Sequence, residues 1–184
     1  WVVPSLVTSW PSRSSWSRIQ RKGNQVIILL LKAAVISGLG LWLATALLNN
    51  LTAFRKGVFA IGMLMGMKLF EQEPAVETPL LSRRVTSTGW HKLVYSAILL
   101  SEAVTVSLLA AAAAAMFGSA LGLVWPATAV DLANLALLAF IALSALMLVG
   151  GTWFAYYIRQ EGAQITHLVM IGVGVAAVQM VNGV

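Results

Sequence analysis

Four residues between positions 91 and 105 are spaced so that they share one face of a helix, and they are the best candidates for chemistry in the chain. They are His91, Tyr95, Glu102 and Thr105, which at 100° per residue fall within about 80° of one another. Glu102 lies inside an apolar segment, where an acid costs roughly 2.5–3.5 kcal/mol on insertion scales and usually faces a partner or a cavity. The pattern predicts either a proton- or ligand-binding acid, or a structural acid that is hydrogen-bonded to Thr105 or to a neighbouring helix.

Two other pairs of polar residues lie at the edges of apolar segments, where helix capping is the simplest interpretation. Asn49 and Asn50 follow the first apolar segment, and asparagine tolerates the left-handed backbone of a helix C-cap. Asp131 and Asn134 stand one helical turn apart at the start of a later segment, where unpaired N–H groups and the helix dipole favour such side chains. The sequence therefore predicts capping at both places.

The sequence lacks the usual catalytic and metal-binding motifs. There is no cysteine, which excludes disulfides, thiolate metal sites and cysteine nucleophiles. No nucleotide loop, zinc motif or hydrolase elbow occurs. His91 and His167 lie near the ends of apolar segments that do not follow one another in the chain, so a haem held by both is not expected. We therefore expect a protein that is not an enzyme and that holds no metal or cofactor.

The composition excludes most classes of soluble protein. The chain has 184 residues, of which 59% are hydrophobic and 10% are charged, and its mean hydropathy is +0.86. Soluble domains carry about 25% charged residues, and a soluble fold of this length has too small an interior to bury so many apolar side chains. The composition indicates an integral membrane protein.

Four segments are long and apolar enough to cross a bilayer as helices, which takes about 20 residues. Their approximate bounds are 25–48, 91–117, 127–149 and 165–181. Lys32 lies near the start of the first segment, from where a lysine can extend to the membrane surface. The sequence thus predicts an all-α integral membrane fold with four transmembrane helices.

The connection between the first two predicted spans contains one further apolar run. Residues 57–70 (GVFAIGMLMGMKLF) are bracketed by Arg55, Lys56 and Lys68. The run is too short to cross a bilayer, so an interfacial or re-entrant segment is expected between the first two helices. The acidic, proline-containing stretch 71–79 predicts a solvated turn.

Residues 1–25 differ in composition from the rest of the chain. They contain Ser, Pro, Arg and three tryptophans, without helical periodicity or any acid. We expect an extended basic tail that lies on the membrane surface or on a partner, because tryptophan favours the headgroup region; a transit-like segment is the alternative. The predicted domains are this N-terminal tail, 1–25, and a four-helix transmembrane domain, 26–184.

The formal net charge of +6, from 12 Lys and Arg against 6 Asp and Glu, indicates contact with anionic lipid headgroups. The basic residues flank apolar segments, so the lipid bilayer is a better partner than nucleic acid. Seven of them lie in or beside the connections after the first and third spans, and four lie in the tail. By the positive-inside rule, this difference favours a cytoplasmic first connection.

Small residues at helical spacing predict close helix packing. Residues 110–115 are all alanine, and three pairs have GxxxG or similar spacing. The pairs are Gly62–Gly66, Gly118–Gly122 and Gly172–Ala176. In lipid, such surfaces let helices approach closely, so we expect several faces to pack against protein, either within the bundle or in a larger complex.

Several short motifs occur in an order that is similar to a known family. They are Asn-Asn-Leu-Thr at 49–52; Arg84, Ser87, His91, Tyr95 and Glu102; Gly-Gly-Thr-Trp-Phe at 150–154, which includes Trp153; and Glu-Gly-Ala-Gln at 161–164. Over residues 26–184 the chain resembles the small bacterial integral membrane proteins of domain of unknown function family 2165. The family pattern has Glu at the position of Thr152 and Asn-Gly-Gln near 161–164. The resemblance implies a four-span protein of the bacterial inner membrane and supplies no reaction.

Two functions of different classes remain. The first is an accessory or scaffolding subunit of a larger respiratory or photosynthetic membrane complex, with other membrane subunits as partners. The second is a small transporter or proton-linked binding protein centred on Glu102. A transporter usually shows several intramembrane polar groups and internal repeats, whereas this sequence shows one deep acid and no repeat. A membrane enzyme has the least support, and the accessory subunit is favoured.

Overall fold

The structure is helical throughout its regular segments over the residues that it describes, 13–183. In this computed structural model four helices are long and apolar enough to cross a membrane: α1 (Arg13–Thr52), α3 (Thr88–Ala120), α4 (Pro126–Trp153) and α5 (Glu161–Asn182). No β-strand occurs in the described part of the chain. The predicted all-α fold with four candidate membrane spans is confirmed.

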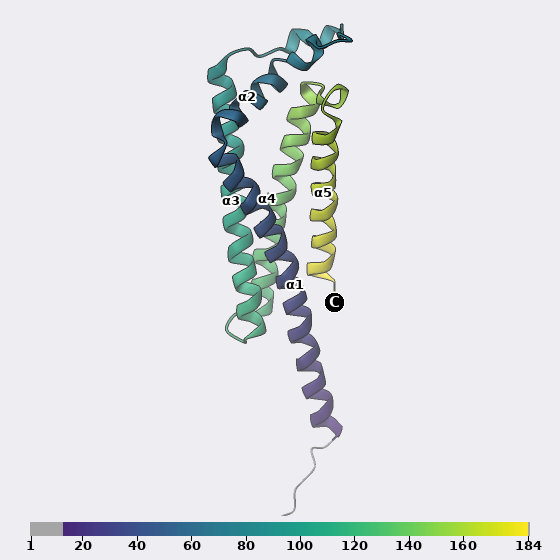
Figure 1. The fold of residues 1–184 in the computed structure, drawn as a ribbon. Helices are drawn as coiled ribbons and strands as arrows, with labels where there is room; N and C mark the ends of the chain where they lie inside the picture. Colours follow the sequence, from purple (N-terminus) through teal and green to yellow (C-terminus); the bar gives the residue numbers. More distant parts are fainter. Residues whose placement is uncertain (1–12, 184) are drawn as a thin grey trace, which may run out of the picture.

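The long helices pack in the order α1, α3, α4, α5, each antiparallel to the next (Figure 1). Short connections explain this order for α3 to α5, because consecutive helices joined by a few residues become antiparallel neighbours. We call the end of the bundle at which residues 53–87 and 154–160 connect the helices the cap end. The turn between α3 and α4 and the C-terminal end of α5 lie at the opposite end (Figure 1).

One hydrophobic core holds all four long helices together. Ile36, Leu109, Leu137 and Phe140 are fully buried in it. Alanine supplies much of the rest, and this small side chain lets helix backbones approach closely in lipid. The buried alanines are Ala33, Ala112, Ala115, Ala129, Ala133, Ala136 and Ala177.

The outer faces of the spans are also apolar. Leu41, Leu138, Leu146 and Val149 each expose more than 60% of their surface. A helix that is apolar on both its packed and its exposed faces belongs in hydrocarbon, so the surface agrees with the membrane nature that the composition indicates.

The first helix is longer than the sequence suggested. It begins at Arg13, so the extended conformation expected for residues 1–25 is wrong for 13–25, which continue α1 without a break. Residues 1–12 of that predicted tail lie outside the described part of the chain. Serine and glycine lower the helix propensity of 13–25, but the adjoining span supplies the helical turns on which they extend, so no new nucleation is required.

A short helix, α2 (Phe54–Met65), follows α1 after a break at Ala53 and packs on the first part of α3. Val58 of α2 joins Tyr95 and Leu99 of α3 in a second hydrophobic cluster. With 12 residues, α2 is shorter than a membrane span requires, as the sequence predicted for this run.

A third cluster closes the cap end. The 3₁₀ turns η1 (Lys68–Glu71) and η2 (Pro79–Arg83) of the first connection lie against η3 (Tyr156–Ile158), which joins α4 to α5. Met67, Phe70 and Ala155 are its buried residues. The stretch 71–79 is largely irregular and exposed, as the sequence predicted. This cluster connects α1–α3 to α4–α5 at a place that the main core does not reach.

Two of the three predicted small-residue pairs have a different role. Gly122 lies beyond α3 at φ +77° and forms the turn into α4, so its spacing from Gly118 reflects a helix end and not a packing motif. A Cβ added at Gly172 would have no atom within 4 Å; the packed glycine of α5 is Gly174, where a Cβ would lie 2.6 Å from Cγ1 of Ile141. Gly172 and Ala176 therefore do not pack within the described bundle, and their packing in a larger complex stays a prediction.

We predict that Gly57→Leu destabilises the protein by about 1–3 kcal/mol, the usual cost of overpacking. A Cβ at Gly57 would lie 1.9 Å from Cζ of Tyr95, so the phenol ring or α2 must move. Gly38→Leu is the matched control, because no atom lies within 4 Å of a Cβ at Gly38. Unfolding in detergent, followed by circular dichroism, measures both variants, and equal stability of the two would contradict the close packing of α2 on α3.

Candidate functional site

A hydrogen-bonded contact between a buried acid and an amide joins α1 to α3. Nδ2 of Asn50 donates to both carboxylate oxygens of Glu102, at 3.1 Å each. Glu102 is only 5% exposed, whereas Asn50 is half-buried. Asn50 belongs to the last turn of α1, and Glu102 lies about four turns into α3. Because the two helices are antiparallel neighbours, the end of α1 reaches this depth on α3.

Tyr95 links the same two helices two turns closer to the start of α3. Its hydroxyl donates to the backbone carbonyl oxygen of Asn50 at 3.1 Å. That carbonyl lies in the final turn of α1, where carbonyls lose their intrahelical partners. Phe54 packs on the phenol ring with a centroid separation of 5.4 Å, and Gly57 leaves the space that the ring fills. Asn50 is therefore held through both its side chain and its backbone.

His91 lies one turn closer to the start of α3 on the same face, and it hydrogen-bonds to the segment that precedes α3. Its Nε2 is 2.8 Å from the carbonyl oxygen of Val85; a carbonyl only accepts, so this nitrogen carries the proton and donates. Gly62 of α2 faces the other side of the ring, where a Cβ would lie 2.8 Å from Nδ1. His91 is about 16 Å from Glu102 along the helix, so the two side chains serve different contacts.

The donor to the Glu102 carboxylate is the Asn50 side-chain amide. None of the described residues forms an ion pair with Glu102. Thr105 is buried beside it but donates its hydroxyl to the carbonyl of Ser101 at 2.8 Å, so the hydrogen bond is to the neighbouring helix and not to Thr105. Among residues 13–183, no group of three His, Asp or Glu side chains lies close enough to hold a metal ion. The arrangement can keep one carboxyl group buried against an amide donor.

A second polar cluster lies at the cap end and uses arginine. Arg83 donates to the carbonyl oxygen of Trp153 at 3.2 Å, and its guanidinium lies 4.5 Å from the centre of the Trp153 ring. The Arg83 cation satisfies a free carbonyl at the C-terminal end of α4, and it also makes a cation–π interaction with the Trp153 indole ring. Arg84 pairs with Glu71 at 3.2 Å, as does Lys68 at 3.4 Å.

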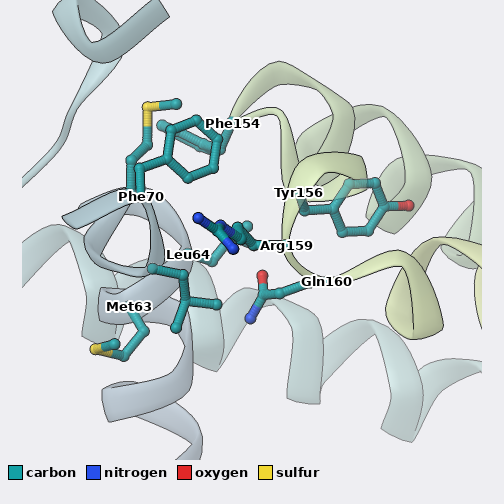
Figure 2. A pocket seen from close by; sticks show the side chains of 9 residues that line it. Met63, Leu64, Phe70, Phe154, Tyr156, Arg159 and Gln160 are labelled. Carbon is teal, nitrogen blue, oxygen red and sulfur yellow. The ribbon is translucent and has the colours of Figure 1, made fainter. Parts of the chain in front are cut away.

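Arg159 binds the first connection across the cap. It donates to the carbonyl oxygens of Gln72, at 3.4 Å, and of Pro74. A cavity of about 10 Å³ adjoins it, and Figure 2 shows Arg159 between Phe154 and Gln160 in the wall of this cavity. That volume is about the size of one water molecule. These contacts fix the cap and enclose no space for a substrate.

Tyr156 and His167 form a further partly buried polar contact at this end. The phenol oxygen lies 3.3 Å from Nδ1 of His167, and the rings are stacked with centroids 6.0 Å apart. Burial raises the pKa of the Tyr156 phenol above its ordinary value because the charged phenolate loses its hydration. Gly151 provides the space beneath the ring, where a Cβ would lie 2.4 Å from Cε2.

The structure brings together some of the predicted site residues and separates others. Asn50, Tyr95 and Glu102 form one network, and His91 lies beyond it on the same face of α3. Asn49 is exposed, and its carbonyl accepts from the backbone N–H of Ala53. Trp153 ends α4 and belongs to the cap.

Both capping predictions are wrong. Asn49 and Asn50 are helical residues, because α1 continues to Thr52; the side chain of Asn50 is used for Glu102. Helix α4 begins at Pro126 without a side-chain cap, so Asp131 lies past its first turn. Asn134 instead exchanges amide hydrogen bonds of 2.8 and 2.9 Å with Asn182 at the end of α5.

Sequence reasoning missed the residues that act through shape or through backbone contacts. Gly57 carries no pattern that distinguishes it from other glycines of the apolar run, although it provides the space for Tyr95. Arg159 was counted only as a charge, because its carbonyl partners at 72 and 74 are far away in the chain. The Asn134–Asn182 contact has a usable signal, since both are amides at the ends of adjacent predicted spans.

A family model described as "Predicted small integral membrane protein (DUF2165)" matches residues 28–182. Neither a curated protein nor a solved structure matches the chain. The match covers three of the candidate spans in full, the first from residue 28 onward, and both polar clusters, and it excludes the first turns of α1.

We predict that Asn50→Ala lowers the unfolding free energy by about 1–3 kcal/mol, because Glu102 then remains buried without its donor. Asn49→Ala, at the exposed neighbouring position, is the control and leaves stability within about 0.5 kcal/mol. The double variant Asn50→Ala, Glu102→Ala is expected to lose less than the sum of the single variants, measured as a double-mutant cycle. Additive losses would contradict a direct interaction between the two side chains.

Proposed function

The chain belongs to the DUF2165 family of predicted small integral membrane proteins, and from this premise we propose that it is a non-enzymatic accessory or scaffolding subunit of a larger membrane assembly. We place it in the bacterial inner membrane, among the subunits of a respiratory or photosynthetic complex. Lipid and neighbouring membrane subunits are its partners.

Polar residues on two helices support one position of the bilayer. Asp131 to Trp153 on α4 and Glu161 to Asn182 on α5 each correspond to about 32–33 Å at 1.5 Å per residue. The hydrocarbon core of a bilayer is about 30 Å thick. We take Asp131 and Asn182 as one boundary, and the cap-end residues of α4 and α5 as the other.

This position accounts for the cap and for α2. Arg55 and Lys56 are exposed at the start of α2, and Phe59 is 69% exposed beside them. Cations next to an exposed aromatic ring suit the headgroup region, so α2 is the interfacial segment between the first two spans. Glu102 then lies inside the hydrocarbon layer, about 10 Å beyond Tyr95. The positive-inside rule places the cap end in the cytoplasm.

Small residues on the outward faces are the observation that carries the subunit proposal. On α5, Gly172 and Ala176 are both exposed, and no atom lies within 4 Å of a Cβ position at Gly172. On α3, Ala110, Ala111 and Ala114 are likewise exposed. Helix faces of this kind gain van der Waals contact when another helix packs against them, and lipid fills them less closely.

We predict that the chain, extracted with a mild detergent from its own membranes, has a native mass larger than that of one chain, and that Gly172→Leu shifts most of it to the mass of the chain alone. The larger side chain prevents close approach at this face. Gly38→Leu is the matched control, an equally open glycine on α1, and it keeps the larger mass. A wild-type protein that is a stable lone monomer would refute the subunit proposal.

The second candidate is a small transporter or proton-linked binding protein. It is favoured by one observation: Glu102 is buried in a span with a hydrogen-bonded amide and without a cation. Intramembrane acids of this kind often mark proton or ion pathways.

For this candidate, Glu102→Gln abolishes proton flux in reconstituted vesicles, measured with a pH-sensitive dye after an imposed gradient. Glutamine keeps the size of the side chain and can accept from Asn50, but it cannot exchange a proton. Asn49→Gln serves as the control for reconstitution, because Asn49 is exposed. A flux that is unchanged in Glu102→Gln, or absent in the wild type, removes this candidate.

A further inference from the structure

The C-terminal end of α4 carries a cation that no described acid neutralises. Arg83 donates to the carbonyl oxygen of Trp153 at 3.2 Å, and its guanidinium lies 4.5 Å from the centre of the Trp153 ring. Glu71, in the neighbouring turn η1, pairs instead with Arg84 and Lys68. A guanidinium has five N–H donors, and the Trp153 carbonyl takes one of them. The others are free to donate to an anion.

The charge around this contact favours an anionic ligand. Residues 53–92 and 154–161, which form the cap end and the adjoining starts of α3 and α5, contain seven Lys and Arg against four Glu. An anionic phospholipid reduces this excess of positive charge, whereas a zwitterionic phospholipid leaves it unchanged. Basic surfaces at the end of a transmembrane bundle attract anionic headgroups for this reason.

Trp153 places the contact at the edge of the membrane. It is the last residue of the candidate span Pro126–Trp153, and it is 57% exposed. Tryptophan is enriched at the level of the lipid headgroups, where its apolar ring and its polar N–H are both accommodated. A guanidinium stacked on this ring therefore lies at the depth of the lipid phosphates.

The face of α4 that leads to Trp153 is apolar and open. Leu146, Val149 and Gly150 lie on the same side of the helix as Trp153, because residues three, four and seven positions apart share a face. Leu146 and Val149 expose 67% and 68% of their surface, and no atom lies within 4 Å of a Cβ position at Gly150. Gly150 thus leaves room for an acyl chain between Leu146 and Trp153, which are about 10 Å apart along the helix.

We propose that Arg83 and Trp153 form the headgroup site of one specifically bound anionic phospholipid, with an acyl chain lying over Gly150 and Leu146. The guanidinium donates to the lipid phosphate from its place over the indole ring, and the apolar face of α4 receives the chain. Charge complementarity selects the anionic class. A lone chain in a bilayer meets the same lipids, so this inference does not depend on the subunit proposal.

The main test titrates the full chain, delipidated in a mild detergent, with phosphatidylglycerol and phosphatidylcholine of identical acyl chains, and counts bound lipids by native mass measurement. The first phosphatidylglycerol is expected to bind about tenfold more tightly than phosphatidylcholine, and Arg83→Gln removes this preference. Lys56→Gln is the control, because it removes one charge from an exposed position on α2, and it keeps the preference. Equal affinity of the two lipids for the wild type overturns the inference, as does a preference that survives in Arg83→Gln or is lost equally in both variants.

A second variant tests the acyl-chain contact without altering any charge. Gly150→Leu fills the open position and is expected to weaken phosphatidylglycerol binding about tenfold. Its thermal midpoint, followed by circular dichroism, stays that of the wild type because the added Cβ meets no other atom. Gly38→Leu, at an equally open and exposed glycine of α1, keeps the wild-type affinity. Unchanged affinity in Gly150→Leu contradicts an acyl chain on this face.

Inorganic phosphate distinguishes a lipid from a soluble anion. It offers a similar anionic group without acyl chains, so an excess of it is expected to leave phosphatidylglycerol bound. Displacement of the lipid by inorganic phosphate would assign Arg83 to a soluble phosphate and overturn the lipid site. The chain extracted from its own membranes is expected to retain an anionic phospholipid that Arg83→Gln loses; retention of zwitterionic lipid alone counts against the inference.

Discussion

The hydrogen bond between Asn50 and Glu102 is the contact on which the arrangement of the cap-end half of the protein depends. A carboxyl group inside a span has no water to satisfy it, so it needs a protein donor at one depth and on one face. Asn50 meets that need only if α1 ends beside the fourth turn of α3. The carbonyl of Asn50 then receives Tyr95, and the break at Ala53 directs α2 onto α3. One buried acid thus defines the register of three helices.

The two halves of the bundle are held by different means. Away from the cap, small residues and Phe140 make one continuous core among all four spans. At the cap end, α1, α2 and α3 share a separate cluster that contains no residue of α4 or α5, and the cap joins the two sets through Met67, Phe70 and Ala155. Arg83 and Arg159 strengthen that junction by binding backbone carbonyls across it. At the cap end, therefore, α1–α3 are joined to α4–α5 mainly through the connecting segments and not through the helices themselves.

The lengths and positions of the helices also determine which helix ends extend beyond the proposed bilayer boundaries. The spans between polar boundaries have similar lengths on α4 and α5, whereas α3 begins well before the cap-end boundary. The extra turns of α3 are covered by α2, with His91 against Gly62.

The sequence by itself determined the four spans, the short length of the α2 run and the shared face of His91, Tyr95, Glu102 and Thr105, because hydrophobic length and helical period are local properties. It also indicated that Glu102 needs a donor. The tertiary structure alone decided which donor: Asn50 looked like a helix end, and its partner lies 52 residues away. It likewise decided that Gly57 and Gly174, and not Gly172, face a neighbouring helix. Spacing along one helix shows which residues share a face, but only the packing of a second helix determines which of those faces is buried.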